Sequence, residues 1–499
     1  KKYNINLSGI YFDVLIAAYV INPGSKVDLA NLVFDELGEE VTEEKKKGQL
    51  GLEIESSEIM SVKICQRADY IYKLKRIYEE KIAEITTSQS GSCNLEKVFF
   101  DLEMPIIEIL AKMELAGIKL NTIIFKGIVE KINKRIANLE KSICELAGKE
   151  FNINSSRQLA DILFVDLKIP TDDIKKGKTG YSTASSELQK IKEKHKIVEK
   201  IEEYREIFKL KTTYLDTMPL LVDDQSRIHT TFNQAVTSTG RLSSSDPNLQ
   251  NIPIRTDIGQ LLRTAFEADE GWKLISADYS QIDLRVVAHM SNDKKMIELF
   301  HKDVDIHRAT AQEVYKVPLS QVTDKMRRSA KALNFGVIYG MSVFGFSQAA
   351  KIERDEAKKF INEYMERFSG IARYMKETKE FAKANLYVET EIGRRRILPE
   401  INSANFMVQS AAERMAINMP IQGLSADIVK LAMLALYKEY KNDPQVKMLL
   451  QVHDEIILEV KESTAKETAR KIKEIMESVY KLKVPLIADV KTGDNWGEI

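Results

Sequence analysis

The stretch WKLISADYSQIDLR, residues 272–285, places a short apolar run directly before a carboxylate. Residues 274–276 follow a Glu-Gly turn signal, and their composition predicts a short buried strand. The apolar spacing that begins at Ile282 predicts one face of a helix. Asp278 would then stand at a strand end, where a carboxylate can hold a hard cation and still face a cleft. Taken alone, such an aspartate more often caps the helix that follows it.

A second carboxylate pair lies in KMLLQVHDEIILEV, residues 447–460, where two apolar runs flank His453-Asp454. This pattern predicts a strand, a tight turn and a strand, with Asp454 and Glu455 at the tip. Carboxylates on separate strand ends can share two Mg²⁺ ions roughly 3.5–4 Å apart. Without a partner carboxylate, the pattern would be an ordinary polar hairpin tip.

The stretch RRSAKALNFGVIYG, residues 327–340, repeats functional side chains every four residues: Arg327, Lys331, Phe335 and Tyr339. In a helix each such step drifts by about 40°, so all four share one broad face. Two cations followed by two aromatic rings suit a phosphate chain and a base. The alternative is a solvated basic turn followed by a buried aromatic stripe, which explains the rings but not their register with the cations.

Two further stretches suit contacts with nucleic acid. The polar loop TGRLSSSDPNLQNIP, residues 239–253, offers hydroxyls, amides and Arg241 to phosphates and base edges. A predicted helix bears Arg414, Asn418 and Gln422 at i, i+4 and i+8, where amides suit minor-groove acceptors. We expect this helix to continue to residue 440, with a kink or break at its internal Pro and Gly.

In order and in wording, these stretches resemble the family A DNA polymerases, from about residue 12 to the C-terminus. DYSQIDLR resembles the family's motif A, RRSAKALNFGVIYG its motif B and QVHDE its motif C. The resemblance is greatest to the Klenow-type large fragment of bacterial members. It implies an α+β multidomain, right-hand polymerase fold, with an antiparallel palm sheet, helical fingers and thumb, and a truncated exonuclease-like N-terminal domain.

The resemblance also implies domain boundaries. It places an inactive 3′→5′ exonuclease-like remnant at 1–95, the thumb at 96–226, the first part of the palm at 227–290, the fingers at 291–393 and the second part of the palm at 394–499.

The remnant is expected to be inactive because most of the acidic metal ligands are not recognisable. Cys65 stands where active members have Tyr, and Asp69, at the position of the last ligand, is expected on a helix surface. The chain begins Lys1-Lys2, so we expect a fragment of a longer protein.

The roles implied by the resemblance are those of two-metal nucleotidyl transfer. Asp278 and Asp454 would bind two Mg²⁺ ions, which Mn²⁺ can replace, with the backbone carbonyl of Tyr279 as a further ligand and Glu455 in support. Lys331 would donate a proton to the leaving pyrophosphate. The expected nucleotide-binding residues are Arg327, Lys331, Phe335, Tyr339, His307, Gln281 and Asp283, and the expected DNA-binding residues are Arg241, Asn418, Gln422, Arg414 and His453.

Three of these residues carry a qualification of their own. His307, in DIHRATA, would approach the triphosphate, with a capping or core histidine as the alternative. Asp283 stands where the family usually has a longer Glu that blocks a ribose 2′-hydroxyl, so weaker exclusion of ribonucleotides is expected. A bond to Tyr339 could restore that exclusion. Phe335, in place of Tyr, predicts discrimination against 3′-deoxy terminators.

Composition agrees with a globular enzyme of two or more domains: 499 residues, 44% hydrophobic and 30% charged, with zero net charge. Three widely spaced cysteines fit no zinc pattern and suit a reducing compartment. No run approaches a membrane span. Zero net charge is unusual for a nucleic-acid-binding domain, but Arg394, Arg395 and Arg396 are expected to be locally positive.

The expected partners are primer–template DNA and dNTPs, with no membrane, for a monomer in the bacterial cytoplasm that associates with the nucleoid. One alternative is a single-subunit RNA polymerase, which would share the palm carboxylates and the motif B Lys and Tyr. The wording of residues 239–253 and QVHDE favours the DNA enzyme. The other alternative is a catalytically inactive DNA-binding accessory protein, which would not need both carboxylates.

Overall fold

A computed structural model describes residues 9–41, 57–88, 94–178, 180–254, 256–302 and 304–499. The sequence is rich in Lys and Glu at 39–47, and the Ser- and Gly-rich run at 88–92 predicts a linker; most of both stretches lies outside the described residues. The chain forms two compact units. The first comprises Lys1–Ala116, Phe232–Ser244 and Ile275–Thr492, and the second comprises Gly117–Thr231, Ser245–Leu274 and Gly493–Ile499.

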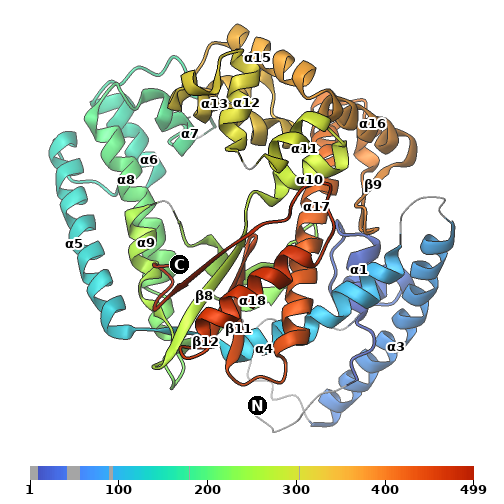
Figure 1. Cartoon of the computed structure of the whole chain (residues 1–499). Coiled ribbons are helices and arrows are strands. Elements are labelled where there is room, and N and C mark those ends of the chain that lie inside the picture. The colour runs from blue at the N-terminus through green and yellow to red at the C-terminus, as the bar shows by residue number, and fades with distance from the viewer. Residues whose placement is uncertain (1–8, 42–56, 89–93, 179, 255, 303) are drawn as a thin grey trace. The chain divides into compact units, whose positions relative to one another are not determined.

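A four-stranded sheet, most of whose residues belong to the first unit, has the strand order β11-β12-β8-β13 (Figure 1). Its strands are β8 (Trp272–Tyr279), β11 (Val446–Val452), β12 (Glu455–Lys461) and β13 (Ala488–Gly493). β11 and β12 pair antiparallel, ending with Val452 opposite Glu455. The predicted strand before Asp278 and the predicted hairpin are therefore confirmed.

Helices pack against this sheet. α4 (Met104–Ala116) and α17 (Phe406–Tyr440) contact β11, and α18 (Ala465–Ser478) contacts β12. α17 runs for 35 residues and contains Pro420 without interruption, so of the expected kink or break the break is wrong and the kink stays a prediction. By length and hydropathy α17 alone among the described helices could cross a membrane, contrary to our expectation of no such run. However, 78% of its apolar window is buried inside the protein.

The segment after β8 is almost entirely helical, as expected. Its helices are α10 (Ile282–Ser291), α11 (Lys294–His301), α12 (Ile306–Tyr315), α13 (Asp324–Ile338), α14 (Val343–Ala350), α15 (Arg354–Arg367) and α16 (Ser369–Asn385), with a 3-10 turn at Leu319–Gln321. α12 packs against α13 and α15. The hairpin of β9 (Tyr387–Glu389) and β10 (Arg395–Ile397) and a 3-10 turn at Pro399–Asn402 lead into α17.

The N-terminal part of the first unit has its own apolar core. α1 (Val14–Ile21) packs against α3 (Ser57–Ser88) and against the π-helix Lys97–Glu103, and α2 (Leu29–Leu37) packs against α3. Asp13 caps α1 by accepting hydrogen bonds from two backbone amides of the first turn. Tyr19 and Tyr78 are both buried in this core. Asp69 lies exposed on α3 and pairs with Lys73 at 2.8 Å, as expected for a surface residue.

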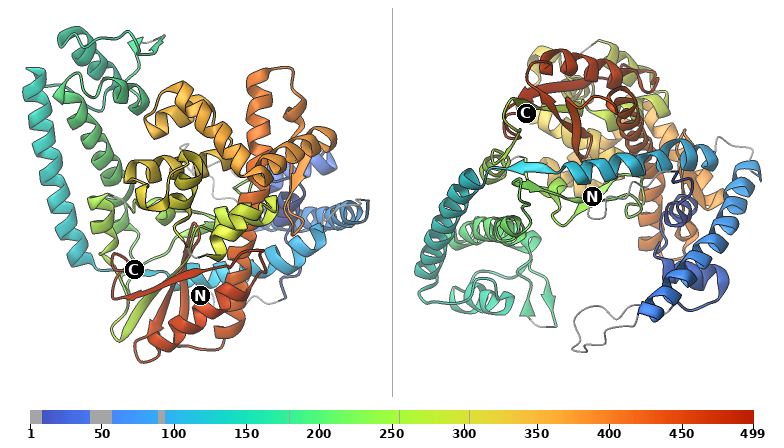
Figure 2. Two further views of the ribbon diagram at one scale, coloured as in Figure 1. Left: turned by 45° about the horizontal axis from the view of Figure 1, so that its top comes forward. Right: turned by 90° about the horizontal axis from the view of Figure 1, so that it is seen from below.

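The second unit contains a three-stranded sheet, β4-β1-β7, made of Arg227–Ile228, Ile118–Leu120 and Phe266–Glu267. α5 (Thr122–Ala147) packs against α8 (Lys196–Leu210), and both views in Figure 2 show them together. Asn121, a residue type that favours helix N-caps, caps α5 and accepts hydrogen bonds from Ile123 N and Ile124 N. Trp496 is fully buried beside Phe266, so it packs in the interior of this unit.

Short elements complete the second unit. They are α6 (Ser156–Ala160), the π-helices Asp161–Asp166 and Lys211–Leu215, α7 (Ser185–Leu188), α9 (Asp257–Arg263) and 3-10 turns at Gln189–Ile191, Met218–Leu220 and Leu249–Asn251. The polar, Gly-containing sequence at 171–186 predicts a loop, and this segment contains a small hairpin, β2 (Lys176–Gly177) and β3 (Gly180–Tyr181). The pair formed by β5 (Thr231–Asn233) and β6 (Ser243–Ser245) belongs mostly to the first unit, and it shows that the polar loop at 239–253 includes a short strand.

Candidate active site

Two turns bring the predicted carboxylates to one edge of the central sheet, where β8 ends and β12 begins. Asp278 is the penultimate residue of β8, and the backbone N–H of Tyr279 donates to the backbone oxygen of Asp454 at 3.2 Å. His453 adopts a positive φ of 57°, and its backbone oxygen accepts a hydrogen bond from the Gln451 amide. The tight turn is therefore tied to the strand that carries Asp278.

The electrostatics of this edge favour a bound cation. Asp278 reaches solvent, yet desolvation by the surrounding protein and the charges of Glu455, Asp454 and Asp489 raise its pKa to about 7. Desolvation also raises the pKa of Asp454 to about 6, although Arg241 opposes this rise. Burial and neighbouring carboxylates thus disfavour the ionised forms of Asp278 and Asp454, and a bound cation would offset that penalty.

The donor set fits a hard divalent cation. Asp278, Asp454 and the Tyr279 carbonyl all offer oxygen, which is the donor atom that Mg²⁺ prefers. The Ser276 hydroxyl donates to Glu455 Oε1, so Glu455 is already oriented by a neighbour. Within the described part of the chain, no group of three His, Cys, Asp or Glu side chains forms a closed cage. Mg²⁺ suits such an open site because it retains water and binds substrate phosphates.

Arg241 points into the carboxylate cluster. Its Nη2 donates to Asp454 Oδ1 at 3.2 Å and lies 3.4 and 3.5 Å from the two carboxylate oxygens of Asp283. From the sequence we expected Arg241 to bind DNA, and no sequence pattern indicated these carboxylate partners. Its DNA-binding role stays a prediction, and the structure adds an ion pair with the catalytic candidate.

Asp283 connects the first turn of α10 to the end of α13. It is buried, and the Tyr339 hydroxyl donates to its Oδ2 at 3.0 Å. Desolvation, followed by the charge of Asp283, raises the pKa of Tyr339 to about 12, and a hydrogen bond with Gln422 lowers it slightly. Tyr339 therefore remains a protonated donor at neutral pH, and the bond considered from the sequence as a possible restraint on Asp283 is present.

Three of the four residues predicted to share a helix face lie on α13. Arg327, Lys331 and Phe335 are all half-buried on this helix, and Tyr339 follows its last residue, with its N–H donating to Phe335 O at 3.1 Å. Arg327 Nε donates to Asp305 Oδ2 at 2.7 Å. The contact joins the start of α13 to the N-cap of α12.

His307 lies buried in the first turn of α12. Its ring is 5.8 Å from that of Phe335, and its Nδ1 is 3.1 Å from the Asn334 side-chain nitrogen. Desolvation lowers the pKa of His307 to about 4, with Asp305 opposing and the nearby cations Lys331 and Arg327 reinforcing that change. A histidine that stays neutral at pH 7 can accept a hydrogen bond but does not add positive charge.

The remaining candidates lie on α17 and at the two turns. Arg414 is exposed, Asn418 and Gln422 are half-buried, and His453 and Gln281 are exposed. Among the described residues, Asn418 Oδ1 has no hydrogen-bond partner. Gly340 has a positive φ of 64°, and a Cβ there would lie 2.6 Å from Arg414 Cγ, so this close approach of α17 requires glycine.

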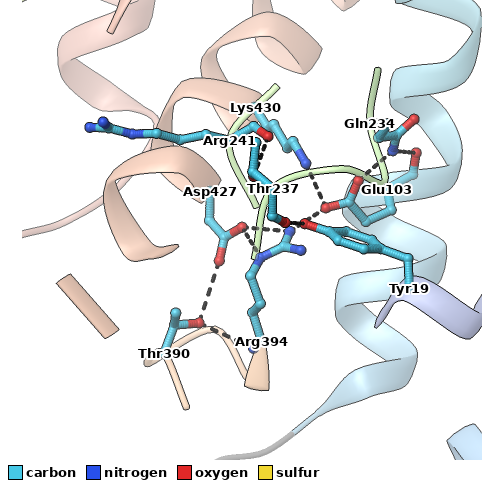
Figure 3. Close-up of polar contacts among 9 residues, drawn as sticks. All are labelled: Tyr19, Glu103, Gln234, Thr237, Arg241, Thr390, Arg394, Asp427 and Lys430. Atoms are coloured by element: carbon cyan, nitrogen blue, oxygen red, sulfur yellow. Dashed lines mark hydrogen bonds and ion pairs between the residues drawn. The ribbon is translucent and has the colours of Figure 1, made fainter. Parts of the chain in front are cut away.

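Arg394 corrects the expectation of a locally positive run. It is completely buried and pairs with Glu103 and Asp427, while Lys430 pairs with Glu103 (Figure 3). Arg394 therefore contributes no positive surface. The partners lie far away in the sequence, and no local pattern indicated them.

Comparisons with known proteins agree on one family. A model described as DNA polymerase family A matches residues 124–498. DNA polymerase I of Bacillus caldotenax is 42% identical over 503 residues, which cover 99% of this chain and 56% of the relative. The thermostable DNA polymerase I of Thermus aquaticus is 45% identical over 420 residues, which cover 84% of this chain and 50% of the relative. The chain thus spans about half the length of these curated relatives.

A solved structure shares the fold. It is described as the POL domain of Pol1 from M. smegmatis in complex with DNA primer-template and dNTP. The TM-score is 0.89 at 36% sequence identity, and the match covers 99% of this chain and 83% of that chain. This likeness confirms the expected α+β fold class, with a short N-terminal region, whereas the domain boundaries stay predictions.

Proposed function

Because the chain belongs to the family A DNA polymerases, we propose that it is a DNA-templated DNA polymerase. It adds deoxynucleotides to a primer 3′-hydroxyl and releases pyrophosphate. The observation that carries the proposal is the edge of the central sheet, where Asp278 and Asp454 lie on hydrogen-bonded strand ends and burial raises the pKa of both carboxyl groups. An accessory protein that only binds DNA would gain nothing from this arrangement.

Asp278, Asp454 and the backbone carbonyl of Tyr279 would hold two Mg²⁺ ions. When bound, the ions supply activation of the primer hydroxyl and neutralisation of charge on the triphosphate. Glu455, oriented by Ser276, adds negative potential beside the two ligands. The general dependence on a divalent cation follows from the family, and the choice of Mg²⁺ and the number of ions belong to this proposal.

The cations on α13 bind the incoming phosphates. Arg327 offers a planar fork and Lys331 a compact ammonium, which also gives its proton to the leaving pyrophosphate. Phe335 packs against the sugar and base, and neutral His307 accepts or donates one hydrogen bond at the phosphate end. Arg327 exchanges its contact with Asp305 for phosphate as substrate enters.

The primer–template lies against a second group of residues. Tyr339 occupies the neighbourhood of the templating base, and its hydroxyl keeps Asp283 at the sugar. Arg241, Asn418 and Gln422 contact the minor groove of the last base pairs. Arg414 and His453 contact the strands nearby, and Gln281 and Asp283 complete the nucleotide pocket. Closure of α13 over a correctly shaped base pair assembles the site.

In the cell, the enzyme acts as a monomer on primer–template DNA and dNTPs in the bacterial cytoplasm, in DNA repair and replication at the nucleoid. We propose that it does not proofread, because Asp69 is exposed and paired with Lys73 on the surface of α3. The N-terminal remnant then has a structural role.

Extension of a primed DNA template with Mg²⁺ tests the proposal, with dNTPs in one reaction and rNTPs in another. We expect rapid dNTP extension that Asp278→Asn abolishes. The matched control is Asp224→Asn, which makes the same change at an exposed position and should retain activity. Primer–template binding without extension under any divalent cation would overturn the proposal in favour of an accessory protein. Synthesis from rNTPs alone would point to an RNA polymerase.

A further inference from the structure

Four charged side chains meet in the interior of the first unit (Figure 3). Glu103 ends the π-helix before α4, Arg394 precedes β10, and Asp427 and Lys430 lie on α17. All four are at most 1% exposed. Arg394 Nε donates to Asp427 Oδ1 at 2.8 Å, Arg394 Nη2 pairs with Glu103, and Lys430 Nζ donates to Glu103 Oε1 at 2.7 Å. The two positive and two negative charges balance within this four-charge cluster.

The four-charge cluster holds one end of the segment 234–241. The side-chain amide of Gln234 donates to the backbone oxygen of Glu103 at 2.7 Å and also to its carboxylate. Near the other end, Gly240 lies directly on Arg394 with a positive φ of 87°, and a Cβ there would be 2.6 Å from Arg394 Nε. The segment is therefore packed onto fixed charges at both ends.

α1 supports the middle of the same segment. The Tyr19 hydroxyl donates to the backbone oxygen of Thr237 at 2.7 Å, and Thr237 Oγ1 donates to the backbone oxygen of Arg241 at 2.6 Å. The Arg241 side chain then reaches Asp454 and Asp283. A continuous series of hydrogen bonds thus runs from the N-terminal helix to the candidate catalytic carboxylate.

Arg241 depends on such support for two reasons. Residues 234–242 form neither helix nor strand, so no ladder of backbone hydrogen bonds fixes them. In addition, the Arg241 contacts measure 3.2 to 3.5 Å, close to the upper limit for a hydrogen bond. A shift of a few tenths of an ångström in the backbone would break them.

We propose that Tyr19 is a positioning residue for nucleotide addition, which acts through Thr237 to hold Arg241 against Asp454 and Asp283. The four-charge cluster is the rigid base of this arrangement. The N-terminal exonuclease-like region therefore contributes to the polymerase site. This inference rests on the proposed polymerase function.

Tyr19→Phe tests the proposal because it removes one hydroxyl and leaves the ring in place. We expect the single-turnover rate of dNTP addition to fall by roughly 2- to 10-fold, the factor that corresponds to one neutral hydrogen bond. The matched control is Tyr78→Phe, because Tyr78 is buried in the same N-terminal core and also bonds through its hydroxyl, to Glu36. The control should retain the wild-type rate. Thr237→Val removes the next bond of the series and should resemble Tyr19→Phe even if that variant folds poorly.

A double-mutant cycle separates positioning from general damage. In an Arg241→Ala background, Tyr19→Phe should cause no further loss, because the residue through which it acts is gone. The proposal is overturned if Tyr19→Phe keeps the wild-type rate, or if its loss persists undiminished in the Arg241→Ala background. Wild-type extension in the same assay tests the polymerase function separately. Its absence would refute that function, whereas extension that Tyr19→Phe leaves unchanged would refute only the positioning role.

Discussion

Glu103→Gln should destabilise the fold strongly, because it removes one charge from a balanced and fully buried cluster. Burial opposes ionisation of Glu103, but the charges of Lys430 and Arg394 outweigh it and lower its pKa from 4.5 to about 2. At about 1.36 kcal/mol per pH unit, this difference corresponds to roughly 3 kcal/mol in favour of the folded state at neutral pH. The loss of one partner from a buried ion pair typically costs about 3–5 kcal/mol, which agrees.

Urea-induced unfolding followed by circular dichroism, at pH 7 and at several lower pH values, measures this contribution. The folded-state pKa of Glu103 is lowered, so its stabilisation is complete above about pH 4.5 and disappears as the pH falls towards 2. The difference between wild type and Glu103→Gln should shrink over that interval. The control Glu96→Gln changes an exposed residue just before the same π-helix and should have no effect. If the free energy of unfolding of Glu103→Gln at pH 7 lies within about 0.5 kcal/mol of the wild-type value, the reasoning about the cluster is refuted, because ordinary surface substitutions have effects of that size.

Three further predictions concern the proposed nucleotide pocket. Asp283→Glu should improve the rejection of rNTPs relative to dNTPs by roughly 10-fold, which is the lower end of what one methylene contributes. The lower end is expected because Tyr339 already holds the shorter carboxylate in place. Equal ratios of kcat/KM for the two substrates in both proteins would contradict this prediction. Phe335→Tyr should increase incorporation of 3′-deoxy terminators in a primer-extension competition, and unchanged incorporation would count against the role given to Phe335. The lowered pKa of about 4 keeps His307 neutral, so the dNTP KM of His307→Gln divided by that of wild type should stay constant from pH 8 to about 5.5. A ratio that changes with a midpoint near pH 6.5 would show that the imidazole titrates there and would contradict this prediction.

The elements that carry the site were predictable because their signals are local. The apolar run before Asp278, the two runs around His453-Asp454 and the four-residue repeat from Arg327 each fix their own secondary structure within about a dozen residues. The strand, the hairpin and the helix all formed as expected.

The contacts that connect these elements were not predictable in the same way. Arg241 and Asp454 are 213 residues apart, and Arg394 and Glu103 are 291 residues apart. Neither pair produces a residue periodicity or a residue spacing that could be recognised in a single sequence. The same reason explains why Arg394 was misjudged as surface charge, since a run of three arginines ordinarily faces water.

Buried pairing also explains why the zero net charge of the chain says little about DNA binding. A cluster of opposite charges in the interior and the same number of opposite charges on the surface both add zero to the net charge. Only the charges on the surface can interact with a polyanion. Arg394 and Lys430 are neutralised in the interior by Glu103 and Asp427, so they offer nothing to phosphates. Arg327 on α13 is half-buried and paired with Asp305, and the acidic edge of the sheet would itself carry bound divalent ions. The field that a nucleotide meets is therefore set by which charges are paired inside the protein, and the total over the sequence does not determine it.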